Sequence, residues 1–483
     1  AGGEEEERQR QGFVGKAGRI MDKILMVGGI PREQVGVTNV VKRAPDGGYD
    51  SEHFKTTFYT RTKVGRRTVV APTDELRSYY EYLGDELRSV HSNVVVAAGQ
   101  EALKALCGIE GISNYRGSVL ESTLIPGLKV VPIMHPSWIQ RKVAWQELWV
   151  SGEIIKRKVV PNMHAPELQR HGWREWVNPS INELNAFTEG VAYNKEPWII
   201  DLETDPKRRL ITHVGMARGS RPGLENAMCM DTHRLTPDDP FWLCVQHVFD
   251  TNPQYVGHNI FYDMAYLHEY GLKLPMPYMD TMLAWHRLYA ELPKDLAFLT
   301  MMLTDIPYYK GERKDWTKKA RYCIKDCVAT LRSMYAILDL FQQRPRQAKL
   351  YWEYDHAILP AAFEMQCLGM VRDDVAHGSI RGLLATELGK IHATLGRLSD
   401  GTLVIKEGNK KITDQQVMAH LYDDLHLPVK HKRGTGSRTA DEDAIIELLI
   451  ANPQQDALRA ILAERKFGKA LNSYVDIEFG GLT

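Results

Sequence analysis

The spacing of hydrophobic and polar residues predicts alternating helices and strands over the first 165 residues. A helix is indicated at 17–28, where Ile20, Ile24 and Leu25 recur at helical spacing. Strands are expected at 35–41, at 93–99 and at 129–137, the last of which runs into a loop. A hairpin is expected within 54–72, with its turn at Val64-Gly65. A helical segment, 100–108, follows the run at 93–99. This alternation predicts an α/β fold.

A second set of elements follows a linker near 160–180. Ser180 and Glu183 match a capping box, which starts a helix before the apolar run Trp198-Ile199-Ile200. Strands and helices then mix, and the pattern beyond them is mostly helical, with a basic loop at 431–443. The predicted parts are a first domain at 1–165, a linker and leading helix at 166–189, a second domain at 190–340 and a third region at 341–483.

The composition is typical of a folded protein, with 43% hydrophobic and 25% charged residues among 483. The sequence contains no run of about 18 apolar residues, so no membrane span is expected. The N-terminal residues do not match a signal peptide. The expected location is therefore the inside of the cell. Lys plus Arg equals Asp plus Glu at 61 each, which neither favours nor excludes a nucleic-acid partner.

The six cysteines are expected to be reduced, buried thiols. Cys323 and Cys327 are spaced to share a helix face, but no second closely spaced pair completes a zinc site. The sequence alone therefore predicts no zinc centre.

Three segments between 195 and 330 carry polar residues at strand or helix spacing. They are Asp201-Leu202-Glu203, Asn259 with Asp263, and Tyr322 with Asp326. Period two places the first two acids on one face of a strand, and a spacing of four places each later pair on one helix face. Each pattern alone is common on protein surfaces. Their order within one α/β segment is what indicates a site.

The four carboxylates of these segments predict a metal site. Closely spaced acids cannot all stay ionised without cations, because each raises the pKa of its neighbours. Hard oxygen ligands favour Mg²⁺ or Mn²⁺, and two such ions roughly 3.5–4 Å apart are suited to in-line attack on a phosphodiester. A tyrosine hydroxyl can orient the attacking water.

The segment resembles the 3′–5′ proofreading exonuclease of family A DNA polymerases, the DEDDy branch of the DnaQ-like fold. The resemblance implies that Asp201, Glu203 and Asp326 hold the tighter metal ion and that Asp201 also reaches the second. It implies that Asp263 acts largely through water and that Tyr322 positions the nucleophile.

Further positions follow from the same resemblance. Asn259 matches the asparagine of the family's second motif and is expected to contact substrate. Asp280, in the stretch 280–288, matches a structural residue. Asp205 has no counterpart in the motif and is expected to be solvated at the end of its strand.

The first domain resembles family 4 uracil-DNA glycosylases in four ordered stretches, 8–18, 38–45, 97–108 and 134–141. The resemblance implies that Phe13 stacks on a base and that Asn39 reads the uracil edge. It implies that the loop with His135 and Ser137 polarises the leaving base and touches the DNA backbone. An aromatic platform and a pairing amide suit an extruded pyrimidine. Each of these residues also has an ordinary structural interpretation. Phe13 could be a core residue, Asn39 a turn residue and His135 a loop histidine with satisfied hydrogen bonds.

Two features of this family are missing from the sequence. The family's water-activating acid lies in a Gly-Glu-x-Pro-Gly stretch, and Ala1-Gly2-Gly3 resembles only the end of such a stretch, so the acid is not visible in the given sequence. Arg43 and Tyr79 stand where the family has cysteine ligands, and Cys107 matches none of them. The expectation is that the domain holds no iron–sulfur cluster, and a DNA-binding or architectural role is at least as well supported as catalysis.

The last 140 residues resemble the start and thumb of a family A polymerase domain in three stretches, 358–374, 425–449 and 461–476. The resemblance implies that Lys466 and Lys469 lie near the DNA backbone and add salt-dependent affinity. An exposed amphipathic helix is the alternative for these lysines. The palm and fingers are not among these residues, so no polymerase active site can be built from them.

The predicted fold class is α/β: a uracil-DNA glycosylase-like domain, a DnaQ/RNase H-like exonuclease domain and a mainly helical thumb region. The predicted function is proofreading hydrolysis of DNA 3′ ends with two Mg²⁺ or Mn²⁺ ions. The expected partners are single-stranded 3′ ends, primer–template DNA and other replication proteins. The fusion of a glycosylase-like domain to a polymerase resembles a phage-type family A enzyme, which implies the cytoplasm of a bacterium or of a phage-infected host cell. A uracil-repair glycosylase with a DNA-binding scaffold and a non-catalytic DNA clamp are the alternatives.

Overall fold

The structure, a computed structural model, describes residues 12–42, 57–64, 67–236, 238–369, 371–405, 411–432 and 436–476. The chain forms two compact units, Ala1–Glu364 and Met365–Thr483. Unit one is a mixed α/β structure and unit two is mainly helical among the described residues, so the predicted fold class is confirmed. The predicted limits at 165, 189 and 340 stay predictions.

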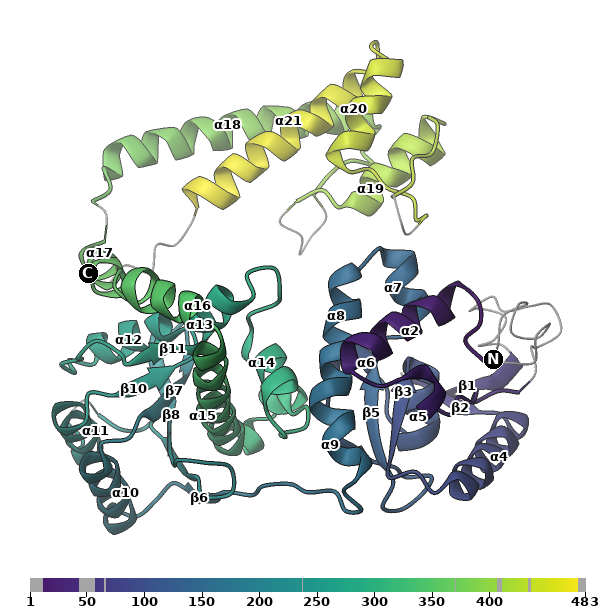
Figure 1. Cartoon of the computed structure of the whole chain (residues 1–483). Coiled ribbons are helices and arrows are strands. Elements are labelled where there is room, and N and C mark those ends of the chain that lie inside the picture. The colour runs from purple at the N-terminus through teal and green to yellow at the C-terminus, as the bar shows by residue number, and fades with distance from the viewer. Residues whose placement is uncertain are drawn as a thin grey trace. The chain divides into compact units, whose positions relative to one another are not determined.

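The N-terminal part of the first unit is built on a three-stranded sheet (Figure 1). The central strand β5 (Lys129–Ile133) is parallel to β3 (Val94–Ala98) and antiparallel to β4 (Leu120–Glu121). The helices of this part are α2 (Lys16–Gly28), α4 (Asp74–Val90), α5 (Gln100–Cys107), α6 (Ile112–Tyr115), α7 (Pro136–Lys142), α8 (Trp145–Ile154) and α9 (Val160–Met163). A hairpin of β1 (Tyr59–Val64) and β2 (Arg67–Pro72) precedes α4.

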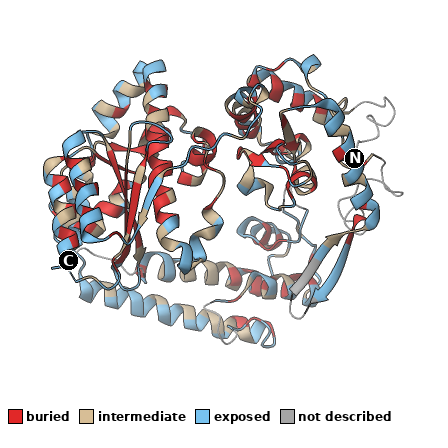
Figure 2. Cartoon of the chain, turned by 90° about the horizontal axis from the view of Figure 1, so that it is seen from below, coloured by how far each residue is buried: buried red, intermediate tan, exposed pale blue. Residues whose placement is uncertain are grey.

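The rest of the first unit is built on a six-stranded sheet with the order β11-β10-β7-β8-β9-β6. The strands are β6 (Arg174–Val177), β7 (Trp198–Asp205), β8 (Leu210–Arg218), β9 (Asn226–Asp231), β10 (Tyr255–Gly257) and β11 (Met279–Asp280). Neighbours β7, β8 and β9 are antiparallel, and β10 is parallel to β7. Figure 2 shows that buried residues are concentrated in these strands.

Helices cover both faces of this sheet. Their bounds are α10 (Ile181–Asn194), α11 (Pro240–Thr251), α12 (Ile260–Glu269), α13 (Thr281–Leu288), α14 (Leu296–Leu303), α15 (Lys319–Gln343), α16 (Pro345–Leu350) and α17 (Leu359–Leu368), which extends into the second unit. On β7, Trp198, Ile200 and Leu202 pack with α10 and α11, whereas Ile199 belongs to the core under α15. The period of two therefore turns Asp201 and Glu203 toward α15.

The two parts of the first unit share one hydrophobic core. Ile154 and Ile155 at the end of α8 belong to the same buried cluster as Met301 of α14. Buried Lys158 donates a hydrogen bond to the carbonyl oxygen of Thr304. Gly117 has a positive φ of 72°, and a Cβ there would lie 2.6 Å from the sulfur of Met301, so glycine permits this close approach. A continuous core of this kind holds the N-terminal part against the six-stranded part.

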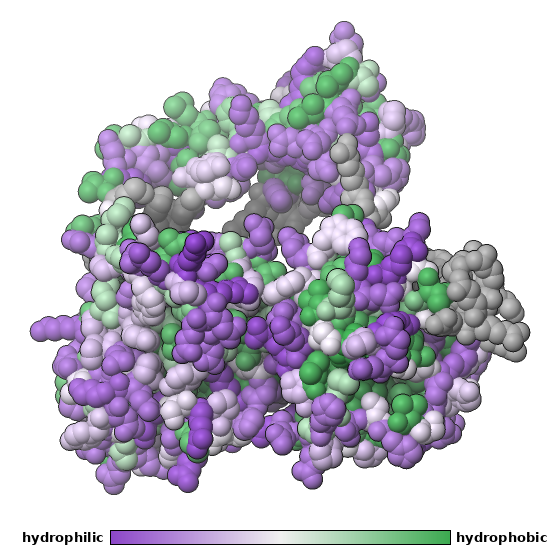
Figure 3. Space-filling model, in the orientation of Figure 1, coloured by the Kyte–Doolittle hydropathy of each residue, from purple (hydrophilic) through white to green (hydrophobic). Residues whose placement is uncertain are grey.

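The second unit consists mainly of α18 (Asp374–Leu398), α19 (Asp414–Ala419), α20 (Glu442–Ala451) and α21 (Asp456–Ala470). The long helices α18 and α21 pack along each other, with Leu395 and Ile461 in the core. The first half of α18 exposes apolar side chains, among them Val375 and Leu383, and green residues lie along this helix in Figure 3.

Most local predictions are confirmed. The helix at 17–28, the strand at 93–99 and the helix at 100–108 are α2, β3 and α5. The hairpin within 54–72 is also present, although its turn at 65–66 lies outside the described residues. The capping box is formed, since Ser180 Oγ accepts from Glu183 N at 3.4 Å and Glu183 accepts from Ser180 N at 2.8 Å.

Two local predictions differ from the structure. The segment 35–41 is not a strand, because no described strand pairs with it and an alternating run needs a neighbour to form a ladder. The strand predicted at 129–137 ends at Ile133, and a helix rather than a loop begins at Pro136, with His135 as its N-cap. No helix among the described residues is long and apolar enough to cross a membrane.

Candidate active site

Strand β7 supplies the first two acids of the site. Asp201 lies opposite Gly215 of β8, and Glu203 lies opposite His213. The face that carries these acids is covered by α15, so Glu203 is only 9% exposed, while Asp201 stays partly open to solvent. Lys319, at the start of α15, forms an ion pair with Glu203.

The third acid, Asp263, comes from the first turn of α12. Its Oδ1 accepts a hydrogen bond from the backbone N of Leu202 at 2.9 Å, which ties α12 to the strand between the first two acids. Asn259 precedes α12 with a left-handed φ of 60°, and its side chain is exposed. Buried Asp280 accepts from the backbone N of Asn259 and Ile260 at 3.2 and 3.0 Å and caps α13. These bonds give Asp280 a structural role.

The fourth acid and the tyrosine come from α15. Asp326 and Tyr322 are one turn apart, and both are buried. Asp326 Oδ1 accepts from Tyr309 Oη at 2.5 Å and from Lys310 Nζ at 2.6 Å. Lys310 Nζ also donates to Tyr322 Oη at 3.1 Å. Since that oxygen already accepts from the lysine, the proton of the Tyr322 hydroxyl is available to an outside acceptor.

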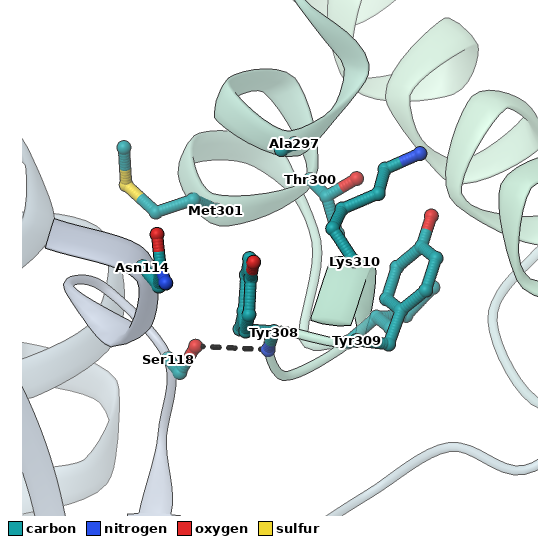
Figure 4. A pocket seen from close by; sticks show the side chains of 9 residues that line it. Asn114, Ser118, Ala297, Thr300, Met301, Tyr308, Tyr309 and Lys310 are labelled. Atoms are coloured by element: carbon teal, nitrogen blue, oxygen red, sulfur yellow. Dashed lines mark hydrogen bonds between the residues drawn. The ribbon is translucent and has the colours of Figure 1, made fainter. Parts of the chain in front are cut away.

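Lys310 lies on a segment that is anchored to the N-terminal part (Figure 4). The backbone N of Tyr308 donates to Ser118 Oγ at 3.1 Å, and the Tyr308 ring lies edge-on to Tyr115 at 5.2 Å. Tyr309 and Lys310 follow directly and both contact Asp326. The N-terminal part therefore helps to position two groups that bind a predicted catalytic acid.

Three of the acids have the geometry of a metal site. Asp201, Glu203 and Asp326 each offer an oxygen within 4.8 Å of the other two. Among the residues that the structure describes, two lysines, Lys310 and Lys319, form ion pairs with these four acids. Because two negative charges remain uncompensated in a buried space, the donor set fits a hard divalent cation such as Mg²⁺.

The pKa values of the acids reflect this excess of negative charge. Burial, together with the neighbouring Cys323 and acids, raises the pKa of Asp201 well above its usual value. Burial raises the pKa of Asp263 and Asp326 as well, and Lys310 opposes the rise at Asp326. Burial raises the pKa of Glu203 to about 7, and Lys319 partly opposes the effect. A bound divalent cation would reverse all of these shifts by favouring the ionised acids.

The raised pKa of Glu203 predicts a pH-dependent stability. The folded protein holds this proton more tightly than the unfolded chain does, so without divalent cations the free energy of unfolding falls as pH rises from 4.5 to about 7. The shift corresponds to at most about 3 kcal/mol. Urea unfolding with EDTA across this range should show a smaller decline for Glu203→Gln than for the unsubstituted protein.

A matched control for this measurement is Glu312→Gln. Glu312 also pairs with a lysine, Lys325, at 2.7 Å, but its side chain is 31% exposed. This variant should keep the decline of the unsubstituted protein. The prediction would be contradicted if the free energy of unfolding fell equally with pH in the unsubstituted protein and in Glu203→Gln.

A groove at the β9 side of the six-stranded sheet is a feature that the sequence did not indicate. It holds about 570 Å³ and is lined by Asn178, Met230, Asp231, His233, Arg234 and Trp316. The Trp316 side chain is 58% exposed and lies edge-on to His213 at 5.3 Å and to His233 at 6.2 Å. His213 of β8 is the cross-strand partner of both Glu203 on β7 and Asp231 on β9, and Asp231 lines the groove, so this Trp316 groove lies two strands from the acids.

The structure also brings together part of the predicted site in the first domain. Phe13 has a left-handed φ of 57°, which is rare for a bulky residue. Its ring lies 5.9 Å from that of His135. His135 Nδ1 lies 2.7 Å from Ser137 Oγ, and a Cβ at Gly99 would approach His135 to 2.9 Å. Asn39 is half-buried on the segment after α2.

The remaining sequence predictions concern the surface and the sheet edge. Lys466 and Lys469 are exposed on α21, and their role at DNA stays a prediction. Asp205 is partly exposed, and its Oδ1 accepts from Lys207 N at 3.1 Å, so it caps the β7–β8 turn. Arg43 lies outside the described residues.

Lys310, Lys319 and Trp316 are the site residues that the sequence interpretation missed. The available signal was the basic and aromatic stretch 308–322, which lies directly before Asp326.

Comparisons with known proteins give two kinds of match. The profile of the Uracil DNA glycosylase superfamily matches residues 1–154. A DNA polymerase of Bacillus phage SP01 is 22% identical over 336 residues, which cover 66% of this chain and 33% of the polymerase. A type-4 uracil-DNA glycosylase of Thermotoga maritima is 31% identical over 144 residues, which cover 29% of this chain and 62% of the glycosylase.

Among solved structures, the polymerase domain of Pol1 from M. smegmatis, in complex with DNA primer-template and dNTP, matches with a TM-score of 0.41 and 17% identity. The match covers 62% of this chain and 49% of the Pol1 chain. A TM-score of 0.41 supports no inference about this chain. This chain spans a third of the length of the phage polymerase. The sequence matches confirm the predicted resemblance to a phage-type family A DNA polymerase with a uracil-DNA glycosylase-like N-terminal domain.

Proposed function

We propose that the chain removes nucleotides from DNA 3′ ends as the proofreading exonuclease part of a family A DNA polymerase. The observation that supports this most directly is the convergence of Asp201, Glu203 and Asp326 within 4.8 Å. Asp263 is tied to the intervening backbone, and Tyr322 lies one turn before Asp326. Single-stranded 3′ ends are the proposed substrate and nucleoside monophosphates the product.

Each residue of the site has a proposed role. Asp201, Glu203 and Asp326 hold Mg²⁺ or Mn²⁺, and Asp263 acts as an outer ligand through water. When bound, two such ions lower the pKa of an attacking water and stabilise the leaving 3′ oxygen. Tyr322, whose oxygen accepts from Lys310 at 3.1 Å, directs its proton toward the water and orients it.

The two lysines have a role that follows from their ion pairs. Lys319 and Lys310 neutralise Glu203 and Asp326, which limits repulsion between the buried acids. Both ammonium groups also lie over the ring of Tyr322, at 5.4 and 5.0 Å. They fix the position of the tyrosine relative to the acids.

The experiment that tests this function follows 5′-labelled single-stranded DNA incubated with the purified chain and Mg²⁺. Stepwise shortening from the 3′ end, release of nucleoside monophosphates and arrest by EDTA are expected. An intact strand, or shortening that EDTA leaves unchanged, would refute the proposal. A strand that contains uracil, treated with alkali after incubation, tests the alternative of a uracil-repair glycosylase.

A DNA-binding role for the first domain is the second proposal, and it rests on the Phe13–His135 contact. The two rings are 5.9 Å apart and tilted by 34°, beside the Ser137 hydroxyl. An aromatic ring beside a polar loop suits an extruded base. Proposed DNA contacts of this domain are therefore Phe13, Asn39, His135 and Ser137, and those of the second unit are Lys466 and Lys469.

The Trp316 groove is proposed to bind a base of the single strand next to the acids. Stacking on an aromatic side chain is worth about 1–3 kcal/mol per base. Trp316→Ala should therefore raise KM for single-stranded DNA about tenfold and leave kcat within about twofold. Steady-state kinetics on an oligonucleotide measures both constants.

The control for this prediction is Trp145→Ala. Trp145 is similarly exposed, at 53%, but belongs to α8 of the N-terminal part. Trp145→Ala should have the same KM and kcat as the unsubstituted protein. An unchanged KM in Trp316→Ala, or a lower kcat with constant KM, would exclude a stacking role.

A further inference from the structure

A cluster of thiols lies behind the candidate active site, between the sheet and α15. Asp201, Gly215 and Cys229 are cross-strand neighbours on β7, β8 and β9. Cys323 and Cys327 are one turn apart on α15, which packs on these three strands. All three cysteines are 0% exposed. The fold therefore brings three of the chain's six thiols to one point beside a catalytic acid.

Distances show how tight this cluster is. Cys323 Sγ lies 3.6 Å from Asp201 Oδ2. The sulfurs of Cys323 and Cys327 and an Asp201 oxygen all lie within 4.8 Å of one another. Cys229 comes to the same place from the sheet, because it lies opposite Gly215 in the strand register, but its sulfur is not one of the three donors within 4.8 Å of one another.

Gly215 makes room for these sulfur atoms. A Cβ at this position would lie 2.6 Å from Cys323 Sγ and 2.7 Å from Cys327 Sγ, which is too close for any other residue. The glycine has no positive φ, so space for the sulfurs, and not backbone strain, is what requires it.

We propose that Cys323, Cys327 and Asp201, beside the buried thiol of Cys229, form a site for a soft divalent cation such as Zn²⁺. Buried cysteines usually act as small apolar residues. Here, however, two thiols and a carboxylate lie within 4.8 Å of one another with a third thiol nearby, and sulfur-rich ligand sets favour tetrahedral Zn²⁺ over Mg²⁺. Each cysteine that binds the ion releases its proton to solvent.

The site shares Asp201 with the proposed exonuclease centre. A carboxylate drawn toward the sulfurs is no longer free for the hard cations held with Glu203 and Asp326. Occupation of the thiol site is therefore expected to lower Mg²⁺-dependent activity, and removal of the soft ion restores it. The thiols provide an inhibitory control that depends on the supply of soft metal ions.

Cobalt is the probe for this site, because Co²⁺ bound by thiolates absorbs strongly in the near ultraviolet and visible regions, whereas Co²⁺ bound by carboxylates does not. One equivalent of Co²⁺ added to the reduced full chain should give thiolate bands, and Zn²⁺ should abolish them. Cys327→Ala should weaken Co²⁺ binding at least about tenfold. Absence of the bands in the unsubstituted chain would overturn the proposal.

Two variants complete the experiment. Cys107→Ala removes a buried thiol from α5, outside the cluster, and should keep the bands; their loss would contradict the site. Asp326→Asn removes a proposed exonuclease ligand and should abolish nuclease activity but keep the bands, which separates the two proposals. If Cys327→Ala does not fold, Cys327→Ser replaces it, and bands that persist in a folded variant at position 327 would refute the assignment.

Discussion

Replacing Asp201 by asparagine should lower the rate of Mg²⁺-dependent removal of 3′ nucleotides at least about 1000-fold, or ~4 kcal/mol. Asp201 lies among the acids, within 4.8 Å of Glu203 and Asp326 oxygens, on the strand that also carries Glu203. Asparagine keeps the size and one oxygen but removes the charge that holds divalent cations. The rate is measured on 5′-labelled single-stranded DNA at saturating Mg²⁺.

DNA affinity separates loss of metal binding from loss of substrate binding. In EDTA, Asp201→Asn should bind single-stranded DNA as well as the unsubstituted protein or more tightly, because a negative charge near the phosphates is gone. Asp205→Asn is the control, since Asp205 lies on the same strand but caps the β7–β8 turn. The assignment of Asp201 as a ligand would be wrong if its variant kept a tenth of the activity.

Replacing Tyr322 by phenylalanine should lower kcat about 10- to 100-fold and leave KM unchanged. The ring is buried against Lys310 and Lys319, so phenylalanine should preserve the packing. What disappears is a hydroxyl that accepts from Lys310 at 3.1 Å and can donate its proton to the attacking water. Single-turnover measurements give the chemical step directly.

Tyr335→Phe is the control for this substitution because Tyr335 lies on the same helix three to four turns later and outside the site. Its kinetics should be unchanged. A raised KM with constant kcat in Tyr322→Phe would assign the hydroxyl to substrate binding instead of water positioning.

Local patterns predicted the elements that carry the site. Period-two spacing identified β7 and the common face of Asp201 and Glu203, and spacing of four identified the pair on α15. The same spacing was wrong for Asn259 and Asp263, because Asn259 precedes α12 in a left-handed conformation and only Asp263 lies on the helix. These patterns are readable in sequence because the periodicity of a strand or helix alone decides which residues share a face. The strand predicted at 35–41 is not present in the structure. A strand needs a neighbouring strand to pair with, and the local sequence does not specify that neighbour.

Groups that come together only through tertiary packing were not predicted. Lys310 and Lys319 could be placed at the acids only after α15 and the segment anchored by Ser118 were in position. The groove at Trp316 likewise depends on residues from three distant segments.

The cysteines show the same division most clearly. The sequence by itself determined that Cys323 and Cys327 share a helix face, because helical spacing alone sets that relation. Only the tertiary structure decided that Cys229 and Asp201 meet them, because the register of β7, β8 and β9 and the packing of α15 over Gly215 are long-range contacts. The backbone period is a local property of the chain, whereas the identity of the opposing side chain depends on how the sheet pairs and which helix covers it.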